Sequence, residues 1–401
     1  MPDQEYAQGK VLIRAETNLP PCSIVVHPEF SSLIIFGTYK LEEESRKRHG
    51  TLEFWLRVTS DDDKESLIRV AELATPDSSI LDAKLHPTDH NILLTAQSTG
   101  EIVIWRFAGL RAWAETVHAE LLQHANNGET KNERKFDLPE HTKSADVITE
   151  NEDRSVLVLS LCFAPVSPYN TLAATLTDGS IVVCVLTNSG IKVRHRLTGA
   201  HSLEAWTASF LNGSENVLFS GGDDAVLAAH DLRMASSSDS DNNESDNGYG
   251  DDIVAPVWSS QRIHSAGVTS IHSFIPTPDY QLWTGGYDDT LALVDLRITD
   301  PMLPIPPRGP TASINLGGGV WKLLPSPVAP ESRMLVCCMY GGARIVDRLS
   351  TEEIASTTEP ANIVASLTQG HESMVYGGAW LDEKTVVTCS FYDKAVQVWR
   401  W

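Results

Sequence analysis

Two pairs of adjacent aspartates are the first residues whose type and spacing could support chemistry. Asp223 and Asp224 follow a glycine pair in the stretch "GGDDAVLAAHDLR". Asp288 and Asp289 follow another glycine pair in "GGYDDTLALVDLR". Neighbouring carboxylates whose pKa values are pushed apart can act as acid and base in catalysis. Because both pairs stand in near-copies of one stretch, the repetition favours a structural turn over a single catalytic pair.

Aspartates recur at one position of this repeat, six residues before the place where the repeat template has a tryptophan. They are Asp178, Asp224, Asp288 and Asp393. A carboxylate in a turn accepts hydrogen bonds from backbone N–H groups. In this template it also bonds to a histidine at the start of the same unit. We therefore expect all four aspartates to hold turns.

Histidines stand at the start of three of these units. They are His201, His264 and His371. Their ordinary role is the hydrogen bond to the turn aspartate. In four units, however, the tryptophan of the template is replaced, by Cys184, His230, Val294 and Val346. The incomplete set of partners predicts that some of these histidines are free for chemistry, with His201 as the first candidate.

The repeated stretches belong to larger units, each with an apolar first strand, a second strand ending in small residues, a tight turn and an alternating third strand. Seven such units follow one another, at 22–58, 80–107, 156–186, 199–233, 263–297, 316–349 and 370–401. A small sheet of this kind cannot bury its apolar faces alone, so neighbours must stack around an axis. The sequence therefore predicts an all-β fold, a seven-bladed WD40-type β-propeller that spans residues 1–401 as one domain.

Three of the segments outside the seven units carry predictions of their own. The last unit ends at its third strand, and the apolar "KVLIRA" at 10–15 is expected to close it as a fourth strand, which removes an exposed edge. Residues 108–150 begin with apolar side chains at helical spacing and then become polar, which predicts a short helix followed by a loop. Residues 234–252 are rich in Ser, Asp and Asn, as is typical of an acidic disordered loop.

The chain carries 53 acidic and 31 basic residues, a formal charge of −22. This excess argues against nucleic-acid binding, which needs clustered Lys and Arg, and favours a basic protein partner. The six cysteines fall in expected strands without the spacing of metal ligands, so we expect reduced thiols and no metal. No segment is apolar enough to cross a membrane and none resembles a signal peptide. The sequence therefore predicts a cytoplasmic protein, and we expect a monomer.

No GxSxG, HExxH or phosphate-binding motif is present. Several blocks do resemble one family. They are "AHSLEAW", "FSGGDDAVL", "HSAGVTSI", "GGGVWKLLPSP", "MVYGGAW" and the final "CSFYDKAVQVWRW", in this order. On these blocks the chain resembles the diphthine methyl esterases, which are WD-repeat enzymes of diphthamide biosynthesis. The resemblance covers the last half of the chain well and the first three blades only as a repeat pattern.

The resemblance implies an enzyme that hydrolyses the methyl ester of methylated diphthine, the modified histidine of translation elongation factor 2. The products are diphthine and methanol, and the resemblance implies no cofactor. It assigns no catalytic set to numbered residues of this chain. Candidate residues must therefore come from what the chemistry requires.

Ester hydrolysis on this substrate needs a base or nucleophile, donors for the developing oxyanion and a seat for a trimethylammonium group. Aligning three units on the apolar residue of their first strand places Trp206, Trp321 and Tyr376 at one equivalent position. Rotation about the propeller axis would bring these rings toward one end of the channel. Aromatic faces attract quaternary ammonium ions. We expect these rings, with Tyr392 of the unusual "SFYD" turn, to bind the substrate.

Backbone donors and a base are expected close by. Gly318 and Gly319 belong to a run of three glycines, and residues without a Cβ let backbone N–H groups approach an oxyanion closely. The base is expected to be Glu204 acting with His201, three residues apart in a loop that leads into an inner strand. Water activated by one of them would attack the ester carbonyl.

Two alternatives stay open. A covalent route would use Ser390 or Cys389, next to the "FYD" turn. A non-catalytic scaffold that docks a basic protein would explain the fold and the charge equally well. It would not explain why acidic and aromatic residues that the repeat does not require gather in the last four blades.

Overall fold

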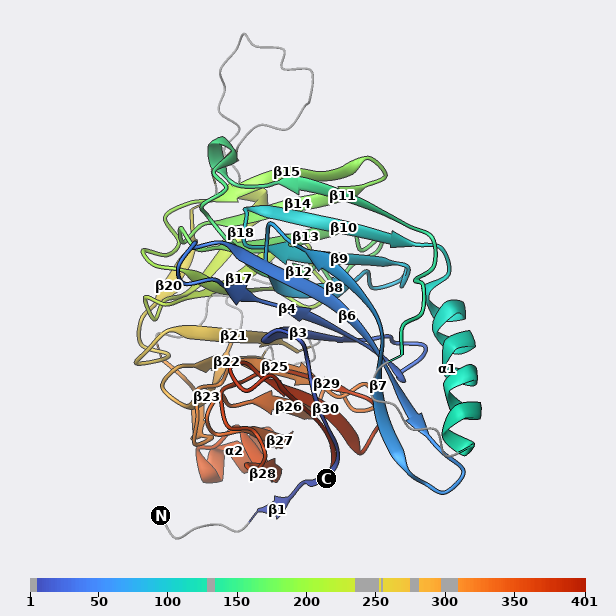
Figure 1. The fold of residues 1–401 in the computed structure, drawn as a ribbon. Helices are drawn as coiled ribbons and strands as arrows, with labels where there is room; N and C mark the ends of the chain where they lie inside the picture. Colours follow the sequence, from blue (N-terminus) through green and yellow to red (C-terminus); the bar gives the residue numbers. More distant parts are fainter. Residues whose placement is uncertain (1–5, 128–133, 235–251, 254, 275–280, 297–308) are drawn as a thin grey trace.

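The computed structural model describes residues 6–127, 134–234, 252–253, 255–274, 281–296 and 309–401. Its strands form seven sheets that stand around a common axis as the blades of a propeller (Figure 1). The predicted all-β, seven-bladed fold is confirmed. In every blade the strand nearest the axis comes first along the chain, apart from short added strands and the closing strand of the last blade.

In the first four blades the main strands follow chain order from the axis outward. Blade one is β3 (Pro21–Val26), β4 (Leu33–Thr38), β6 (Arg48–Thr59) and β7 (Glu65–Thr75), with the short β5 (Lys40–Leu41) on β6; blade two is β8 (Ile80–Leu85), β9 (Ile92–Gln97), β10 (Glu101–Phe107) and β11 (His141–Val147); blade three is β12 (Val158–Phe163), β13 (Thr171–Leu176), β14 (Ile181–Thr187), β15 (Gly190–Leu197) and the short β19 (Asp252–Ile253); blade four is β16 (Ala205–Phe210), β17 (Val217–Gly222), β18 (Leu227–Asp231) and β20 (Trp258–Ser260).

The last three blades follow the same plan. Blade five is β21 (Val268–Ser273), β22 (Gln281–Gly286), β23 (Thr290–Asp295) and β24 (Ala312–Asn315); blade six is β25 (Lys322–Pro325), β26 (Arg333–Cys337), β27 (Ala343–Arg348), β28 (Ala361–Leu367) and the short β1 (Ala7–Gln8); blade seven is β29 (Val375–Trp380), β30 (Thr385–Ser390), β31 (Ala395–Arg400) and β2 (Lys10–Glu16).

Strand β2 brings the start of the chain to its end. It pairs antiparallel with β31, with Ala15 opposite Val396 and Lys10 opposite Arg400. Ile13 on β2 is buried in a cluster shared with blades one and seven. The ring is therefore closed both by this strand pairing and by apolar packing between blades one and seven.

Helix α1 (Leu110–Asn126) lies along the outside of blade one (Figure 1). Leu110, Val117 and Leu121, at helical spacing, are buried in the same cluster as the strands of blade one. A second helix, α2 (Thr351–Thr357), begins at a capping box in which Ser350 and Glu353 bond to each other's backbone N–H groups. No helix in the described part of the chain is long and apolar enough to cross a membrane.

The loop predicted after this helix, up to residue 150, is wrong in part. Residues His141–Val147 form β11, the outer strand of blade two, paired along its length with β10. Most of its side chains are exposed on both faces, so no alternation of apolar residues marks the strand in the sequence. The acidic loop predicted at 234–252 lies outside the described residues, apart from Met234 and the start of β19.

Histidine–aspartate pairs hold the turns of blades four and five. Asp224 Oδ1 lies 3.1 Å from His201 Nδ1, and Asp288 Oδ1 lies 3.0 Å from His264 Nδ1. In both blades the N–H of the residue after the histidine donates to Oδ2 at 2.8 Å. Although burial opposes ionisation, these hydrogen bonds keep the pKa of both carboxyls below the usual value. The prediction that these two acids hold turns is confirmed.

The other two predicted turn aspartates have different partners. Asp393 accepts hydrogen bonds from the Glu372 N–H at 2.7 Å and the Ser373 hydroxyl at 3.1 Å. Asp178 accepts from the N–H and hydroxyl of Ser180 at 3.0 and 2.6 Å. Asp178 therefore serves a local turn, whereas Asp393 joins its turn to the start of blade seven, and neither of these bonds involves a histidine.

Candidate functional site

A bulge near the start of several inner strands turns one side chain out of the ladder. In blades four and seven the residues skipped by the strand pairing are Trp206 and Tyr376. In blade six Trp321 stands directly before β25, and its N–H donates to the Cys337 carbonyl at 2.8 Å. Bulges re-aim side chains, and all three rings are half-buried. The equivalent positions predicted for these residues correspond to one repeated backbone feature.

The three rings meet at one end of the channel. Ring centroids of Trp206 and Trp321 lie 5.6 Å apart, and those of Trp321 and Tyr376 lie 4.9 Å apart. Blades four and six are not neighbours, so this contact must cross the mouth of the channel. Tyr287 of blade five completes the group, 6.2 Å from Trp206 and 6.0 Å from Trp321. We call Trp206, Tyr287, Trp321 and Tyr376 the ring cluster.

Tyr287 and Phe391 were missed in the sequence because they stand in a turn and not in an inner strand. Each is the first residue after the second strand of its blade, following Gly286 and Ser390. Aligning the units on these small residues could have revealed them. Phe391 extends the aromatic surface, since its centroid lies 5.7 Å from that of Tyr376 and 6.0 Å from that of Tyr39 in blade one.

Tyr392, also predicted to bind substrate, lies at the margin of this surface. Its side chain touches Phe391, with centroids 5.0 Å apart, and the residue is 67% exposed. The turn of blade seven is one residue longer than that of blade five, and Tyr392 is the added residue. The structure therefore places it outside the ring cluster.

Two acidic side chains border the ring cluster on the side of blade four. Asp223 accepts a hydrogen bond from the Trp206 indole N–H at 2.9 Å, which fixes the orientation of that ring. Burial, the Tyr376 hydroxyl, Asp223 and Glu204 all raise the pKa of Tyr287 above its usual value. Glu204, which is partly exposed, lies beside Asp223, since its backbone carbonyl accepts the Asp223 N–H at 2.9 Å. The phenol stays protonated and able to donate a hydrogen bond.

The structure corrects the role predicted for His201. Its side chain has no exposed surface. Nδ1 faces Asp224, and Nε2 lies 2.9 Å from the Ser220 hydroxyl. His230, in the place of the template tryptophan, reaches the same hydroxyl at 3.0 Å. Because both ring nitrogens are occupied and burial lowers the pKa of His201 despite Asp224, this histidine is not placed to act as the base.

The histidines that start blades five and seven are occupied in the same way. His264 bonds to Asp288 and to Thr284, and His371 bonds to Ser390 and Thr388. The prediction that loss of the template tryptophan frees these histidines is wrong. Hydroxyl groups on the second strand satisfy the second ring nitrogen whether or not a tryptophan is present.

Gly318 and Gly319 do not offer the oxyanion donors predicted for them. Both are buried. A Cβ on Gly318 would overlap the Cys338 carbonyl oxygen, and one on Gly319 would lie 2.7 Å from the Met339 sulfur. These glycines allow the chain entering blade six to pack against the turn of the same blade. Because both residues are buried, a ligand does not reach their backbone N–H groups in this conformation.

The covalent route also loses its support. Cys389 is fully buried, and burial raises the pKa of its thiol well above the usual value. The Ser390 hydroxyl lies 2.6 Å from His371 Nδ1, a spacing suited to a nucleophile and its base. Ser390 nevertheless has no exposed surface. An ester could not reach its oxygen in this conformation.

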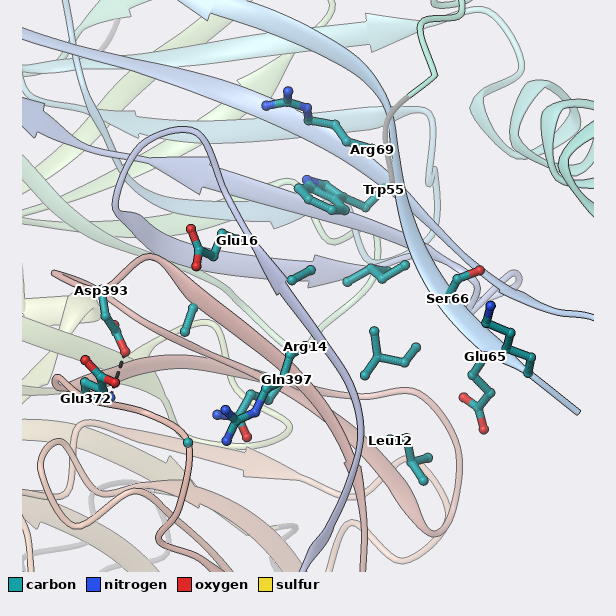
Figure 2. A pocket seen from close by; sticks show the side chains of 16 residues that line it. Leu12, Arg14, Glu16, Trp55, Glu65, Ser66, Arg69, Glu372, Asp393 and Gln397 are labelled. Atoms are coloured by element: carbon teal, nitrogen blue, oxygen red, sulfur yellow. Dashed lines mark hydrogen bonds between the residues drawn. The ribbon is translucent and has the colours of Figure 1, made fainter. Parts of the chain in front are cut away.

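A separate pocket of about 810 Å³ lies on the outside of the ring, between β2 of blade seven and β6 and β7 of blade one (Figure 2). Its lining mixes apolar and charged side chains, among them Arg14, Glu65 and Arg69. Its one tryptophan, Trp55, is packed under Arg69 and donates its indole N–H to the buried Glu53 at 3.0 Å. None of the predicted site residues lines this pocket.

Comparison with curated proteins finds relatives over nearly the whole chain. The diphthine methyltransferase of Saccharomyces cerevisiae is 29% identical over 98% of both chains. That of Schizosaccharomyces pombe is 30% identical over 92% of this chain and 91% of the relative. The diphthine methyltransferase homolog of Dictyostelium discoideum is 27% identical over 94% and 95%. No family model matches the chain.

Among solved structures, the chain is similar to one in the "Crystal Structure of Mitotic Checkpoint Complex", with a TM-score of 0.59 and 14% identity over 100% of this chain and 94% of the other. This likeness shows the propeller fold alone. The curated relatives match all seven blades, whereas the sequence blocks marked mainly the last half of the chain. The resemblance inferred from those blocks is confirmed, and the chain belongs to the diphthine methyltransferase family.

Proposed function

We propose that this protein acts in diphthamide biosynthesis, as a hydrolase that removes the methyl ester of methylated diphthine on translation elongation factor 2. Diphthine and methanol would be the products. The observation that carries the proposal is the ring cluster at the mouth of the channel, because diphthine bears a trimethylammonium group. The relatives named for diphthine supply the class of substrate.

The ring cluster has the composition of a quaternary ammonium site. Its neighbouring centroids lie 4.9 to 6.2 Å apart, and a cation against such faces gains about 0.5–2 kcal/mol per ring. Trp206 and Trp321 supply indole faces, which attract cations most strongly. Asp223 and Glu204 add negative charge beside the rings, and the net charge of −22 would steer a basic partner toward the protein.

Glu204 is the proposed base. It is partly exposed at the edge of the ring cluster, whereas His201 is closed off. Its carboxylate takes a proton from water, whose oxygen attacks the ester carbonyl carbon. The tetrahedral intermediate expels methoxide, which takes up that proton and leaves as methanol. The protonated Tyr287 hydroxyl supports this chemistry as a donor beside the reacting ester.

Methyl transfer is a second candidate function, because the relatives are named for it. A transferase would pass a methyl group from a donor such as S-adenosylmethionine to diphthine, and it would consume no water. A hydrolase would consume water and need no donor. A scaffold that only docks a basic protein would consume neither water nor a methyl donor. The three functions differ in the fate of the methyl group.

We further propose that the protein works as a cytoplasmic monomer without a metal or organic cofactor. Its contact would be with the elongation factor, and not with nucleic acid or a membrane. The acidic excess suits such a partner, since complementary charge speeds the encounter of two proteins.

The proposal is tested by mixing the purified protein with elongation factor 2 that carries methylated diphthine, without any methyl donor. We expect the modified peptide to lose one methyl group while an equal amount of methanol appears. Glu204→Gln should lower turnover by at least about 100-fold and leave the melting temperature unchanged, whereas Glu120→Gln, an exposed acid on helix α1 outside blade one, should change neither. A methyl gain that requires the donor would establish the transferase. Binding without any mass change would establish the scaffold.

A further inference from the structure

Three charged side chains meet inside the channel. Asp82 lies on β8 of blade two, with its Oδ1 3.3 Å from Lys84 Nζ and 4.0 Å from Lys322 Nζ. Its Oδ2 accepts the Leu161 N–H of blade three at 3.0 Å. Lys322 belongs to β25 of blade six, which is not a neighbour of blade two. Its side chain must therefore extend across the channel to reach this aspartate.

The group carries one positive charge more than Asp82 can neutralise. Although burial opposes ionisation, Lys322, Lys84 and the Leu161 N–H hold the pKa of Asp82 below its usual value, so the carboxylate stays charged. The side chain of Asp82 is 4% exposed, while that of Lys322 is 29% exposed to the channel. One lysine would balance the aspartate. Burial lowers the pKa of Lys322, and Asp82 opposes this shift. The second lysine leaves an ammonium group facing the channel in a protein whose net charge is −22.

Neighbouring thiols do not cancel this charge. Cys22 and Cys337 lie close to Lys322, and Cys162 lies close to all three charged groups. Burial raises the pKa of each thiol above its usual value, in opposition to the lysines. The thiols are therefore neutral near pH 7. The local charge stays positive.

This cation lies next to the ring cluster. Lys322 directly follows Trp321 along the chain. Cys22, which holds the bulge position of blade one, is near enough to both Lys322 and Tyr376 for each pair to interact electrostatically. An aromatic surface suited to a cation therefore adjoins an ammonium group suited to an anionic oxygen.

We propose that Lys322, held across the channel by Asp82, is the oxygen-binding half of the substrate site. The inference rests on the proposed function, because diphthine carries its ammonium and carboxyl groups as neighbours on one side chain. With the trimethylammonium group against the rings, the ester carbonyl oxygen faces Lys322. When water adds to the carbonyl carbon, the C=O electron pair moves to this oxygen, and the ammonium group stabilises the negative charge. After the C–OCH₃ bond breaks and methanol leaves, the product carboxylate pairs with the same lysine.

The kinetic test compares Lys322→Gln with Lys322→Arg, which keeps the charge, and with Lys143→Gln, an exposed lysine on the outer strand β11 of blade two. Loss of an oxyanion partner lowers kcat on the order of 100-fold. We expect this loss in Lys322→Gln with KM changed much less, substantial recovery in Lys322→Arg, and wild-type kinetics in Lys143→Gln. A folded Lys322→Gln protein with wild-type kcat would overturn the inference and leave the esterase itself standing.

A binding test separates the inference from the reaction. Glycine betaine carries both a trimethylammonium group and a carboxylate, whereas tetramethylammonium carries only the cation. Titrations followed by NMR should show that Lys322→Gln weakens the binding of glycine betaine about tenfold and leaves the binding of tetramethylammonium unchanged. Equal loss of both probes, or of neither, would overturn the role of Lys322. If the wild type released no methanol but bound glycine betaine in this lysine-dependent way, the proposed reaction would fail and the oxygen site would stand.

Discussion

Replacing Trp321 with alanine is expected to weaken capture of a trimethylammonium group without unfolding the blade. Trp321 contacts every other member of the ring cluster, at centroid distances of 5.6, 6.0 and 4.9 Å. Removing it takes away one cation–π wall, worth about 0.5–2 kcal/mol. It also removes a packing neighbour from Trp206 and Tyr376, so those rings lose part of their fixed orientation. A loss near the upper end, about 1–2 kcal/mol, corresponds to roughly 5- to 30-fold in affinity.

The assay is a titration of the purified protein with tetramethylammonium, followed by indole fluorescence or NMR, beside a neutral tert-butyl compound of the same shape. The charged probe should bind more weakly to Trp321→Ala, and the neutral probe should show little difference. Trp321→Phe should lie between the mutant and the wild type, because a smaller aromatic face remains. Trp258→Ala, on the outer strand of blade four, serves as the control. An affinity of folded Trp321→Ala within twofold of the wild type would refute the assignment of the ring cluster.

Three further predictions concern the fold. Asp288→Asn should lower the free energy of unfolding by about 1–3 kcal/mol, since it weakens the charged hydrogen bonds to His264 and to the Ser265 N–H. Asp289→Asn should have little effect. Urea unfolding compares the two variants, and equal losses would contradict the turn assignment. Deleting residues 1–16 removes β2 and should lower Tm by at least about 5 °C, because β31 becomes an open edge. An unchanged Tm would rule out a stabilising role for β2. Acid should destabilise the protein between pH 6.5 and 4, because three histidines become protonated there in the unfolded state but stay neutral while buried in the folded state. By pH 5 each of these histidines should lower the free energy of unfolding by about 2 kcal/mol. A urea midpoint that does not fall between pH 7 and pH 5 would contradict this. These histidines, whose pKa values burial lowers to about 3, 4 and 4, are His230, His272 and His371.

The propeller could be predicted because its signal is local and repeated. Glycine pairs, turn aspartates and alternating strands recur along the chain, and closure of the ring follows from stacking. Strand β11 could not be predicted in the same way, because its side chains are mostly exposed and its position depends on pairing with β10. The position of an outer strand depends more on the strand that it pairs with than on its own sequence pattern.

The residues of the site could be predicted only where the same position of the repeat carries an aromatic residue in several blades. Trp206, Trp321 and Tyr376 share a backbone position, so aligning the units brought them together before the structure did. Lys322 and Asp82 each follow the bulge position of their inner strand, in blades on different sides of the axis. The shared position places both residues in inner strands, but it does not indicate which blades' side chains meet. No spacing in the sequence expresses a contact made across the channel.

The error over His201 has a physical cause as well. Loss of the template tryptophan suggested a free ring nitrogen, but the Ser220 hydroxyl occupies it, and His230 bonds to the same hydroxyl from the place of the tryptophan. A buried polar group finds another partner when its usual one is replaced. Glu204 stays available because the repeat requires nothing of it.

The proposed hydrolysis can be tested at the level of single atoms by running the reaction in water labelled with oxygen-18. Elongation factor 2 carrying methylated diphthine would be treated with the protein, without a methyl donor, and the modified peptide and the methanol analysed by mass spectrometry. Attack of water on the ester carbonyl predicts one labelled oxygen in the diphthine carboxylate and unlabelled methanol. Label in the methanol, or a methyl group that leaves only in the presence of an acceptor or donor, would contradict hydrolysis by this route.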